Sequence, residues 1–213
     1  MEQRVQKYTK TARIFHWLHT GAFIVLVLTG IFLYANVGLV AQDSWSRLVH
    51  RIAAVVFIIA PLVQLFGNRK TAVASLKSAF TWGVDDLNWA LAMPRYYFLA
   101  DEEAMPSQDE MNTGQKLWYF ILLVFSPIFV ITGILMAFFK DTLPPAVFQW
   151  SVFVHDVAFI VVFLMFLIHI YLGVIHPLMR QHGGSFSSMV EGTVTADYAK
   201  SHHGKWYERI SKR

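Results

Sequence analysis

Four apolar stretches, each long enough to cross a membrane, constrain this chain more than any other feature. A bilayer core about 30 Å thick needs about 20 consecutive apolar residues in a helix. The stretches cover residues 14–36, 48–67, 117–139 and 148–176. Only 15% of the residues are charged, well below the roughly 25% of soluble domains. The sequence therefore predicts an all-α integral membrane protein, a four-helix bundle.

The first stretch follows a basic segment, as a secretory signal would. Its apolar run is longer than the roughly 7–15 residues usual in signals, and it contains His16 and His19. We therefore interpret it as a retained span.

The basic residues indicate how the spans are oriented. Four Lys and Arg residues precede residue 16, five lie in the 68–116 connection and six follow residue 176. The other three are Arg47, Arg51 and Lys140, near the two short turns. Because basic residues are retained in the cytoplasm, we expect both termini and the long connection on that side.

The remaining segments suit the membrane surface. The 68–116 connection mixes apolar, aromatic and charged residues, which favours helices lying in the interface, with a polar loop over 101–112. Residues 177–213 are expected to form a cytoplasmic C-terminal extension. No internal repeat is evident on inspection, and we expect residues 1–213 to form a single domain.

Two histidines interrupt the last apolar stretch. His155 and His169 are fourteen residues apart, so they lie about 40° apart around a helix and about 21 Å apart along it. Even a neutral imidazole has a donor and an acceptor that need partners in lipid. Two imidazoles on one helix face indicate partners at two depths.

The other apolar stretches supply such partners. With the expected orientation, His50 matches the depth of His155 near the outer face, and either His16 or His19 matches His169 near the cytoplasmic face. Haem iron commonly takes an imidazole from each side, and helical bundles supply such ligands from facing helices. The pattern predicts two bis-histidine b haems, although spacing does not decide between His16 and His19.

Two other interpretations of these histidines compete with haem ligation. A lone membrane histidine often serves only in helix–helix hydrogen bonding, and a zinc site would need three or four ligands at one depth. The absence of cysteine excludes disulfides, iron–sulfur ligation and covalent haem attachment within this chain. We interpret His176 as an interfacial histidine, and His202 and His203 as structural or partner-facing residues of the tail.

Several short motifs resemble one family. They are R-I-F-H-W (13–17), R-L-V-H (47–50), M-N-T-G-Q-K (111–116), V-H (154–155), L-I-H-I-Y (167–171), V-E-G-T-V (190–194) and A-K-S-H-H-G-K-W-Y (199–207). Over nearly its whole length, the chain resembles the gamma subunit of respiratory formate dehydrogenases, a four-helix di-haem cytochrome b.

The resemblance implies particular site residues. The ligand on the family's first helix is the histidine followed by tryptophan, which is His16 here. The outer haem pair would then be His50 and His155, and the inner pair His16 and His169. The family's quinone site maps onto Asn112, Gly114 and Gln115, with His169 close by.

The resemblance also implies a function in anaerobic respiration at the bacterial inner membrane. Electrons would pass from an iron–sulfur subunit through two b haems to menaquinone or ubiquinone near the cytoplasm. A molybdenum or tungsten subunit would oxidise the substrate, so we expect no catalytic residue for that step here. Besides these subunits, the expected partners are lipid and quinone, and no nucleic acid.

Three alternatives remain open on the residues alone. The chain could serve a nickel–iron hydrogenase or another quinone-linked oxidoreductase. It could be a stand-alone quinone-reactive cytochrome b. It could also be a non-redox anchor or transporter whose histidines relay protons.

Overall fold

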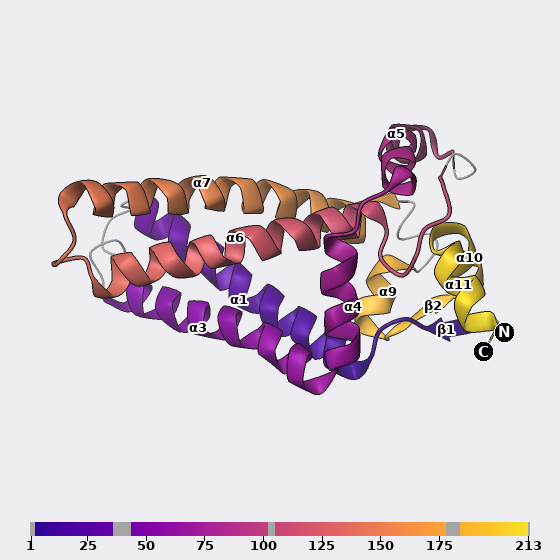
Figure 1. Cartoon of the computed structure of the whole chain (residues 1–213), viewed down its shortest axis with the longest axis horizontal. Helices are drawn as coiled ribbons and strands as arrows, with labels where there is room; N and C mark the ends of the chain where they lie inside the picture. The colour runs from indigo at the N-terminus through magenta and orange to yellow at the C-terminus, as the bar shows by residue number, and fades with distance from the viewer. Residues whose placement is uncertain (1–2, 36–43, 102–104, 178–183, 213) are drawn as a thin grey trace. The chain divides into compact units, whose positions relative to one another are not determined.

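The computed structural model describes residues 3–35, 44–101, 105–177 and 184–212. It divides into two compact units, one of Thr9–Val73 and one of Met1–Tyr8 with Ala74–Arg213. Each unit contains one pair of long, apolar helices (Figure 1).

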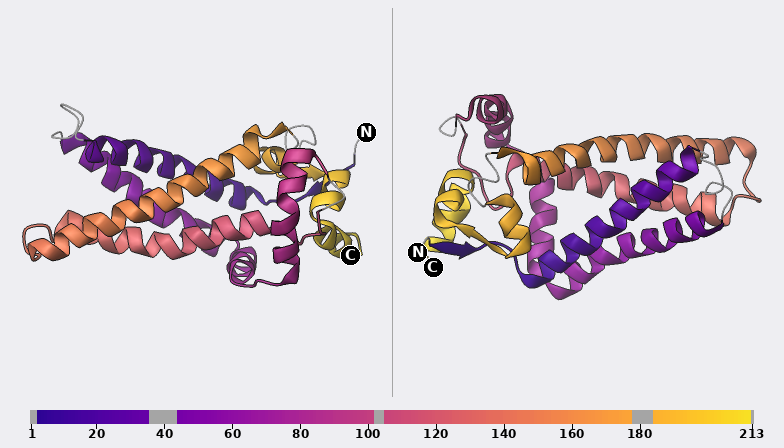
Figure 2. Two further views of the ribbon diagram at one scale, coloured as in Figure 1. Left: turned by 90° about the horizontal axis from the view of Figure 1, so that it is seen from above. Right: turned by 180° about the vertical axis from the view of Figure 1, so that it is seen from behind.

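The first unit is built on α1 (Lys10–Tyr34) and α3 (Ser44–Gly67), which pack side by side and antiparallel (Figure 2). Thr9 caps α1, because its side chain accepts a hydrogen bond from the Ala12 N–H. At the same end of the pair, α3 closes at Gly67, where a Cβ atom would lie 2.7 Å from Cγ2 of Thr11. Only glycine permits so close an approach.

The second unit contains α6 (Thr113–Phe138) and α7 (Pro145–Ile170). Asn112 caps α6, and Pro145 occupies the first turn of α7, where its missing N–H costs no hydrogen bond. A π-helical segment, η1 (Tyr171–Ile175), continues α7. Such segments are rare and frequently occur at functional sites.

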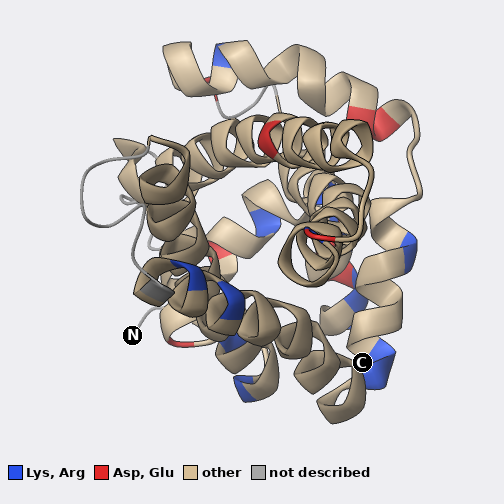
Figure 3. Cartoon of the chain, turned by 90° about the vertical axis from the view of Figure 1, so that its left-hand side faces the viewer, with Lys and Arg blue, Asp and Glu red and all other residues tan. Residues whose placement is uncertain are grey.

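The four long helices are long and apolar enough to cross a membrane. In Figure 3 most of their ribbon is tan, with a few blue and red segments. The expected all-α fold with four membrane spans is therefore confirmed. The helices begin three or four residues before the predicted starts, at residues 10, 44, 113 and 145. In α1 and α6, the polar caps Thr9 and Asn112 extend the helix beyond the apolar run. Residue 36, the predicted end of the first span, lies outside the described residues.

The 68–116 connection contains the two short helices α4 (Arg69–Ala79) and α5 (Val84–Leu99). Ala100 ends α5 in the left-handed conformation, with φ of 55°. The expectation of helices in this connection is confirmed. Their placement at the membrane surface stays a prediction.

The tail pairs with the N-terminal segment, which the sequence did not predict. Strand β1 (Arg4–Gln6) is antiparallel to β2 (Thr193–Thr195), with Val5 opposite Val194. Three further helices of the tail are α9 (Ser185–Val190), α10 (Ala196–His202) and α11 (Gly204–Ser211). The buried core here consists of Tyr96, Val194, Tyr198, Ala199 and Trp206.

Candidate functional site

His50 lies on α3 and contacts the neighbouring helix of its own unit. Its Nδ1 is 2.8 Å from the hydroxyl oxygen of Thr29 on α1. A Cβ atom on the next residue, Gly30, would lie in ordinary contact with the imidazole, 3.6 Å from Cε1. The helix pair itself therefore holds one edge of this ring.

His155 has the same arrangement in the other unit. Its Nδ1 is 2.7 Å from the hydroxyl oxygen of Thr132 on α6. The Phe129 ring meets the imidazole edge-on, with the ring centroids 5.0 Å apart. Both histidines assigned to the outer level are thus held through Nδ1 by a threonine of the preceding helix.

The two contacts lie in an internal repeat of the sequence, although no repeat was expected. Residues 29–31 and 132–134 both read T-G-I, and residues 49–50 and 154–155 both read V-H. Two residues after each histidine, a β-branched residue is followed by alanine, as Ile52 and Ala53 in the first pair and as Val157 and Ala158 in the second. The matching positions are few and scattered, so the repeat emerges only when Thr29 and Thr132 are seen to perform the same contact.

His169 is the penultimate residue of α7, and η1 begins two residues later. Its ring stacks on Trp118 of α6, with centroids 5.2 Å apart and planes 15° apart. Trp118 is one helical turn beyond Gln115. Trp118 was not predicted as a site residue, although its place just after the N-x-G-Q element could have suggested it.

His16 and His19 lie on α1 in different surroundings. His19 stacks on Phe57 of α3, with ring centroids only 3.9 Å apart and planes 22° apart. His16 meets the Trp17 ring edge-on at 5.0 Å. The His19 ring is therefore engaged in packing within its own helix pair.

The predicted quinone residues at the start of α6 form a capping box. Asn112 Oδ1 accepts the Gln115 N–H at 2.9 Å, and Gln115 Oε1 accepts the Asn112 N–H at 3.0 Å. Gly114 lies against Trp89, whose Cη2 would be 3.1 Å from an added Cβ. The element thus has a structural role as a helix cap, and both side-chain orientations are set by it.

Asp86 anchors this cap from α5. Its carboxylate accepts hydrogen bonds from the Thr113 hydroxyl at 2.8 Å and the Lys116 ammonium at 2.9 Å. It also accepts the Gly83 N–H at 3.0 Å. Burial by itself would raise the pKa of Asp86, but these hydrogen bonds together with the Lys116 charge hold that pKa below its ordinary value. The ionised carboxylate therefore joins the start of α5 to the start of α6.

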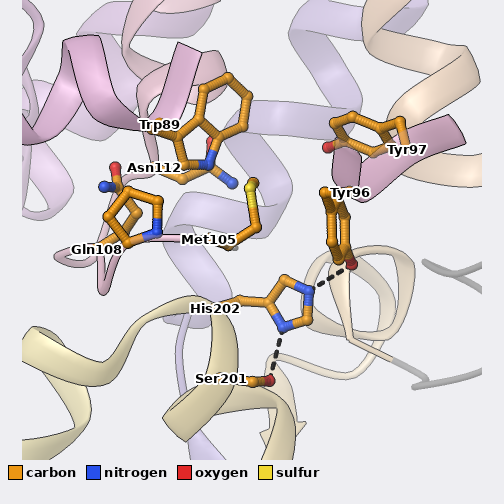
Figure 4. Close-up of a pocket in the computed structure, with 9 residues that line it drawn as sticks. Trp89, Tyr96, Tyr97, Met105, Gln108, Asn112, Ser201 and His202 are labelled. Carbon is orange, nitrogen blue, oxygen red and sulfur yellow. Dashed lines mark hydrogen bonds between the residues drawn. The ribbon is translucent and has the colours of Figure 1, made fainter. Parts of the chain in front are cut away.

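A small cavity of about 10 Å³, enough for about one water molecule, adjoins the cap (Figure 4). Asn112, Tyr96 and His202 line it. The Tyr96 hydroxyl is 2.6 Å from Nε2 of His202, whose Nδ1 is 2.8 Å from the Ser201 hydroxyl. The family-like tail motif thus reaches the same cavity as Asn112.

A larger, mostly apolar hollow of about 370 Å³ lies beside the end of α7. It is lined by Met93, Tyr97, Phe98, Leu167, Ile168, Tyr171, Leu172 and His176. His176 was expected at the interface, yet it is only 6% exposed, and its Nε2 lies 3.2 Å from the Tyr97 carbonyl oxygen. Two rings, those of Tyr97 and Tyr171, meet its imidazole edge-on.

His203 is a structural residue of the tail. It is fully buried, its Nδ1 lies 2.7 Å from the Asp109 carbonyl oxygen, and its Nε2 lies 2.5 Å from the Lys7 ammonium nitrogen. Burial, with the Lys7 charge second, lowers the pKa of His203 well below its ordinary value. Of the two expected roles, structural or partner-facing, the structural one agrees with this burial.

Four apolar spans, with histidines held between paired antiparallel helices, define a membrane protein of the cytochrome b class. The chain matches the family described as prokaryotic cytochrome b561 over residues 7–192, and it belongs to that family.

Curated relatives agree with this assignment. The chain is 23% identical to the formate dehydrogenase cytochrome b556(fdo) subunit of Escherichia coli K12, covering 98% of this chain and 94% of the relative. It is 23% identical to the nitrate-inducible cytochrome b556(Fdn) subunit of the same organism, covering 94% and 88%. It is 24% identical to the formate dehydrogenase cytochrome b556 subunit of Haemophilus influenzae, covering 99% and 86%.

The residues present fit the b-type haem that a cytochrome b carries. Imidazole nitrogen is a common axial ligand of haem iron. His50 and His155 each engage Nδ1 with a threonine, so Nε2 is the ring nitrogen that would face the iron. The donor chemistry of His50 and His155 is therefore suitable for an axial ligand of haem iron.

Proposed function

We propose that this chain is the membrane cytochrome b subunit of a bacterial formate dehydrogenase complex. It would bind two b haems and reduce a quinone near the cytoplasmic face. One observation carries the proposal. The same contact between a threonine and a histidine occurs in both helix pairs of a chain that belongs to the cytochrome b561 family. The names of the curated relatives support formate dehydrogenase as the complex.

In this proposal, His50 and His155 hold the outer haem, and His16 and His169 hold the inner haem. The two levels are about 21 Å apart along α7. The stacking of His19 on Phe57 supports His16 as the ligand from α1. When bound, the haems supply one-electron transfer, while the protein supplies ligands, orientation and electrostatics.

The partner subunits would dock at the two short outer turns, predicted over 34–46 and 140–147. Residues 36–43 of the first turn lie outside the described residues. Aromatic side chains at the edges of the turns are exposed, with Tyr34 at 78%, Trp45 at 67% and Trp150 at 65%. Such residues suit either a membrane-interface belt or contacts with an iron–sulfur subunit, which receives its electrons from a molybdenum or tungsten subunit.

The quinone would be reduced beside the inner haem. Because the capping box occupies the side-chain oxygens of Asn112 and Gln115, the remaining polar atoms of these side chains are amide N–H donors. Such donors suit the carbonyl oxygens of a quinone. Trp118, stacked on His169, joins this element to the inner ligand, and the apolar hollow beside α7 would accept an isoprenoid tail.

The test is haem stoichiometry combined with the composition of the purified complex. A pyridine haemochrome assay on the chain purified from native membranes should give two haems per polypeptide. The preparation should contain an iron–sulfur protein and a molybdenum or tungsten enzyme, and formate should reduce both haems. One haem per chain would contradict the proposed ligand pairing, and a co-purifying hydrogenase would contradict the proposed complex.

A further inference from the structure

The hydroxyl groups of Thr29 and Thr132 have a second contact besides histidine. Thr29 Oγ1 lies 2.6 Å from the Val25 carbonyl oxygen, and Thr132 Oγ1 lies 2.7 Å from the Ile128 carbonyl oxygen. A carbonyl oxygen can only accept, so each hydroxyl donates its single proton to the carbonyl four residues earlier. Both hydroxyl oxygens must then accept a hydrogen bond from the imidazole.

This donation determines the tautomer of the two histidines. The proton of each ring must sit on Nδ1, because Nδ1 is the atom facing the threonine oxygen. In the neutral imidazole, Nε2 then carries the lone pair. A metal requires a deprotonated ligand nitrogen, so the tautomer suited to iron binding at Nε2 is selected before iron arrives.

We propose that Thr29 and Thr132 are a matched pair of positioning residues for the outer haem. Each orients its histidine, holds it in the Nδ1–H tautomer and raises its basicity as an iron ligand. This inference rests on the proposed function, and it assigns a role to two residues outside the ligand set.

Burial makes this arrangement effective. Thr29 and Thr132 are 9% and 6% exposed, respectively, so little water competes for the imidazole N–H. Hydrogen bonds are stronger in such low-dielectric surroundings. A partner of this kind fixes both the tautomer and the orientation of a ligating histidine, and its loss typically costs about 10–100-fold in metal affinity.

The inner haem serves as the reference against which changes at the outer haem are measured. At the inner level, His169 packs by stacking on Trp118, far along α7 from Thr132's contact with His155. Substituting either threonine should therefore alter the outer haem and leave the inner haem unchanged.

The experiment compares Thr29→Val and Thr132→Val with Thr29→Ser and Thr132→Ser in the complete complex. Valine preserves the side-chain shape and removes the hydroxyl, whereas serine retains it. Ser151→Ala is the matched control, because Ser151 on α7 is buried and also bonds the carbonyl four residues earlier, at 2.9 Å from Val147. Haem content and the midpoint potential of each haem are measured by pyridine haemochrome and optical redox titration.

In the valine variants, we expect outer-haem affinity to fall about 10–100-fold. The outer haem that remains should titrate at a higher potential, because a less basic imidazole stabilises ferric iron less. The serine variants and Ser151→Ala should match the wild type. If a valine variant does not accumulate, Thr29→Ala and Thr132→Ala replace it.

Wild-type potential and wild-type outer-haem content in the variants without a hydroxyl would overturn the inference. A shift that serine does not restore would also overturn it, since shape alone would then explain the effect. Failure of the proposed function looks different. In that case the wild-type chain itself binds no outer haem, or His50→Ala retains it.

Discussion

The α1–α3 pair and the α6–α7 pair have the same side-chain contact near one end and different residues near the other end. Near the connections within each pair, α1 with α3 and α6 with α7 use the same threonine and histidine contact. Fourteen residues after the histidine, α7 has His169, whereas α3 has Gln64.

The first helices of the two pairs differ as well. Thirteen residues before the threonine, α1 has His16, whereas α6 has Tyr119. The contact between threonine and histidine is therefore present in both pairs, whereas His16 and His169 each have a different residue type at the corresponding position of the other pair.

The largest expected effect concerns the duplicated level. His50→Ala and His155→Ala should each remove the outer haem completely and abolish formate-driven quinone reduction, because one imidazole alone leaves the iron without its second protein ligand. Haem content should fall to about half in both variants, with the inner haem intact by optical spectroscopy.

This result would show that the two pairs are equivalent at this level. The equivalence would fail if only one variant lost its haem. The depth pairing would fail if either variant lost both haems to the same extent. His176→Ala serves as the control for haem content alone, because His176 belongs to neither haem pair but lines the hollow proposed for the quinone tail.

The second prediction concerns the positions at which the two helix pairs have different residues. His16→Ala should remove the inner haem, whereas His19→Ala should retain it with at most a small spectral shift, because His19 stacks on Phe57. Gln64→Leu should also retain both haems, since the position corresponding to His169 is not a ligand in the first pair.

Low-temperature spectra of the three variants provide the measurement. Loss of the inner haem in His19→Ala with retention in His16→Ala would reverse the ligand assignment. Loss of a haem in Gln64→Leu would show that binding of the inner haem also depends on the position of α3 that corresponds to His169.

The third prediction compares the caps of the first helix of each pair. Thr9→Ala should cost only the stability of a cap, about 0.5–2 kcal/mol. Asn112→Ala should cost a similar amount and also reduce quinone turnover, because it removes an amide donor as well. Asn112→Asp retains a capping oxygen without that donor, so it should preserve stability and still reduce turnover.

Thermal unfolding and steady-state quinone kinetics separate these two effects. Normal turnover in Asn112→Asp would contradict the quinone assignment and leave Asn112 with its capping role. Haem content should remain at the wild-type value in all three variants.

The effect with the smallest consequence for haem and quinone concerns the segment that leads into α1. Burial lowers the pKa of Lys7 to about 7, although the charge of Glu110 opposes this shift. Between about 7 and the ordinary value of 10.5, the unfolded segment binds a proton that the folded one does not. The free energy of unfolding should therefore rise with pH in this window, by at most about 1.4 kcal/mol per pH unit, and stay level below it.

Hydrogen-exchange protection of the paired strands β1 and β2, followed from pH 6 to pH 10, measures this dependence. Lys7→Met should flatten the profile in that window. His203 and Glu110 are the ionisable groups that act on Lys7, and Arg209 acts on Glu110. Arg209→Gln therefore provides a comparison in which Lys7 is retained. A flat profile in the wild type would contradict the role given to Lys7.

Hydrophobic length made the membrane spans predictable, because lipid requires a long apolar helix whose backbone is hydrogen-bonded internally. Spacing along one helix likewise predicted that His155 and His169 share a face. The helix starts were less predictable. Polar caps such as Asn112 belong to the helix but add nothing to the apolar signal.

The contacts between distant segments could not be predicted in the same way. The pairing of Val5 with Val194, the anchoring of α6 by Asp86 and the contact of Thr29 with His50 join residues far apart in the chain. A threonine in an apolar helix has many possible partners, and its sequence context did not distinguish a ligand-orienting role from a simple backbone hydrogen bond.

The sequence by itself determined four apolar spans, the residue types able to ligate haem iron and the family of the chain, because these depend on local composition, helical period and short motifs. Only the tertiary structure decided which nitrogen of His50 and His155 is held, that Asn112 and Gln115 cap a helix, and that the tail binds the N-terminal strand. These features depend on side chains brought together by packing, and their hydrogen bonds form only when the neighbouring element is in place.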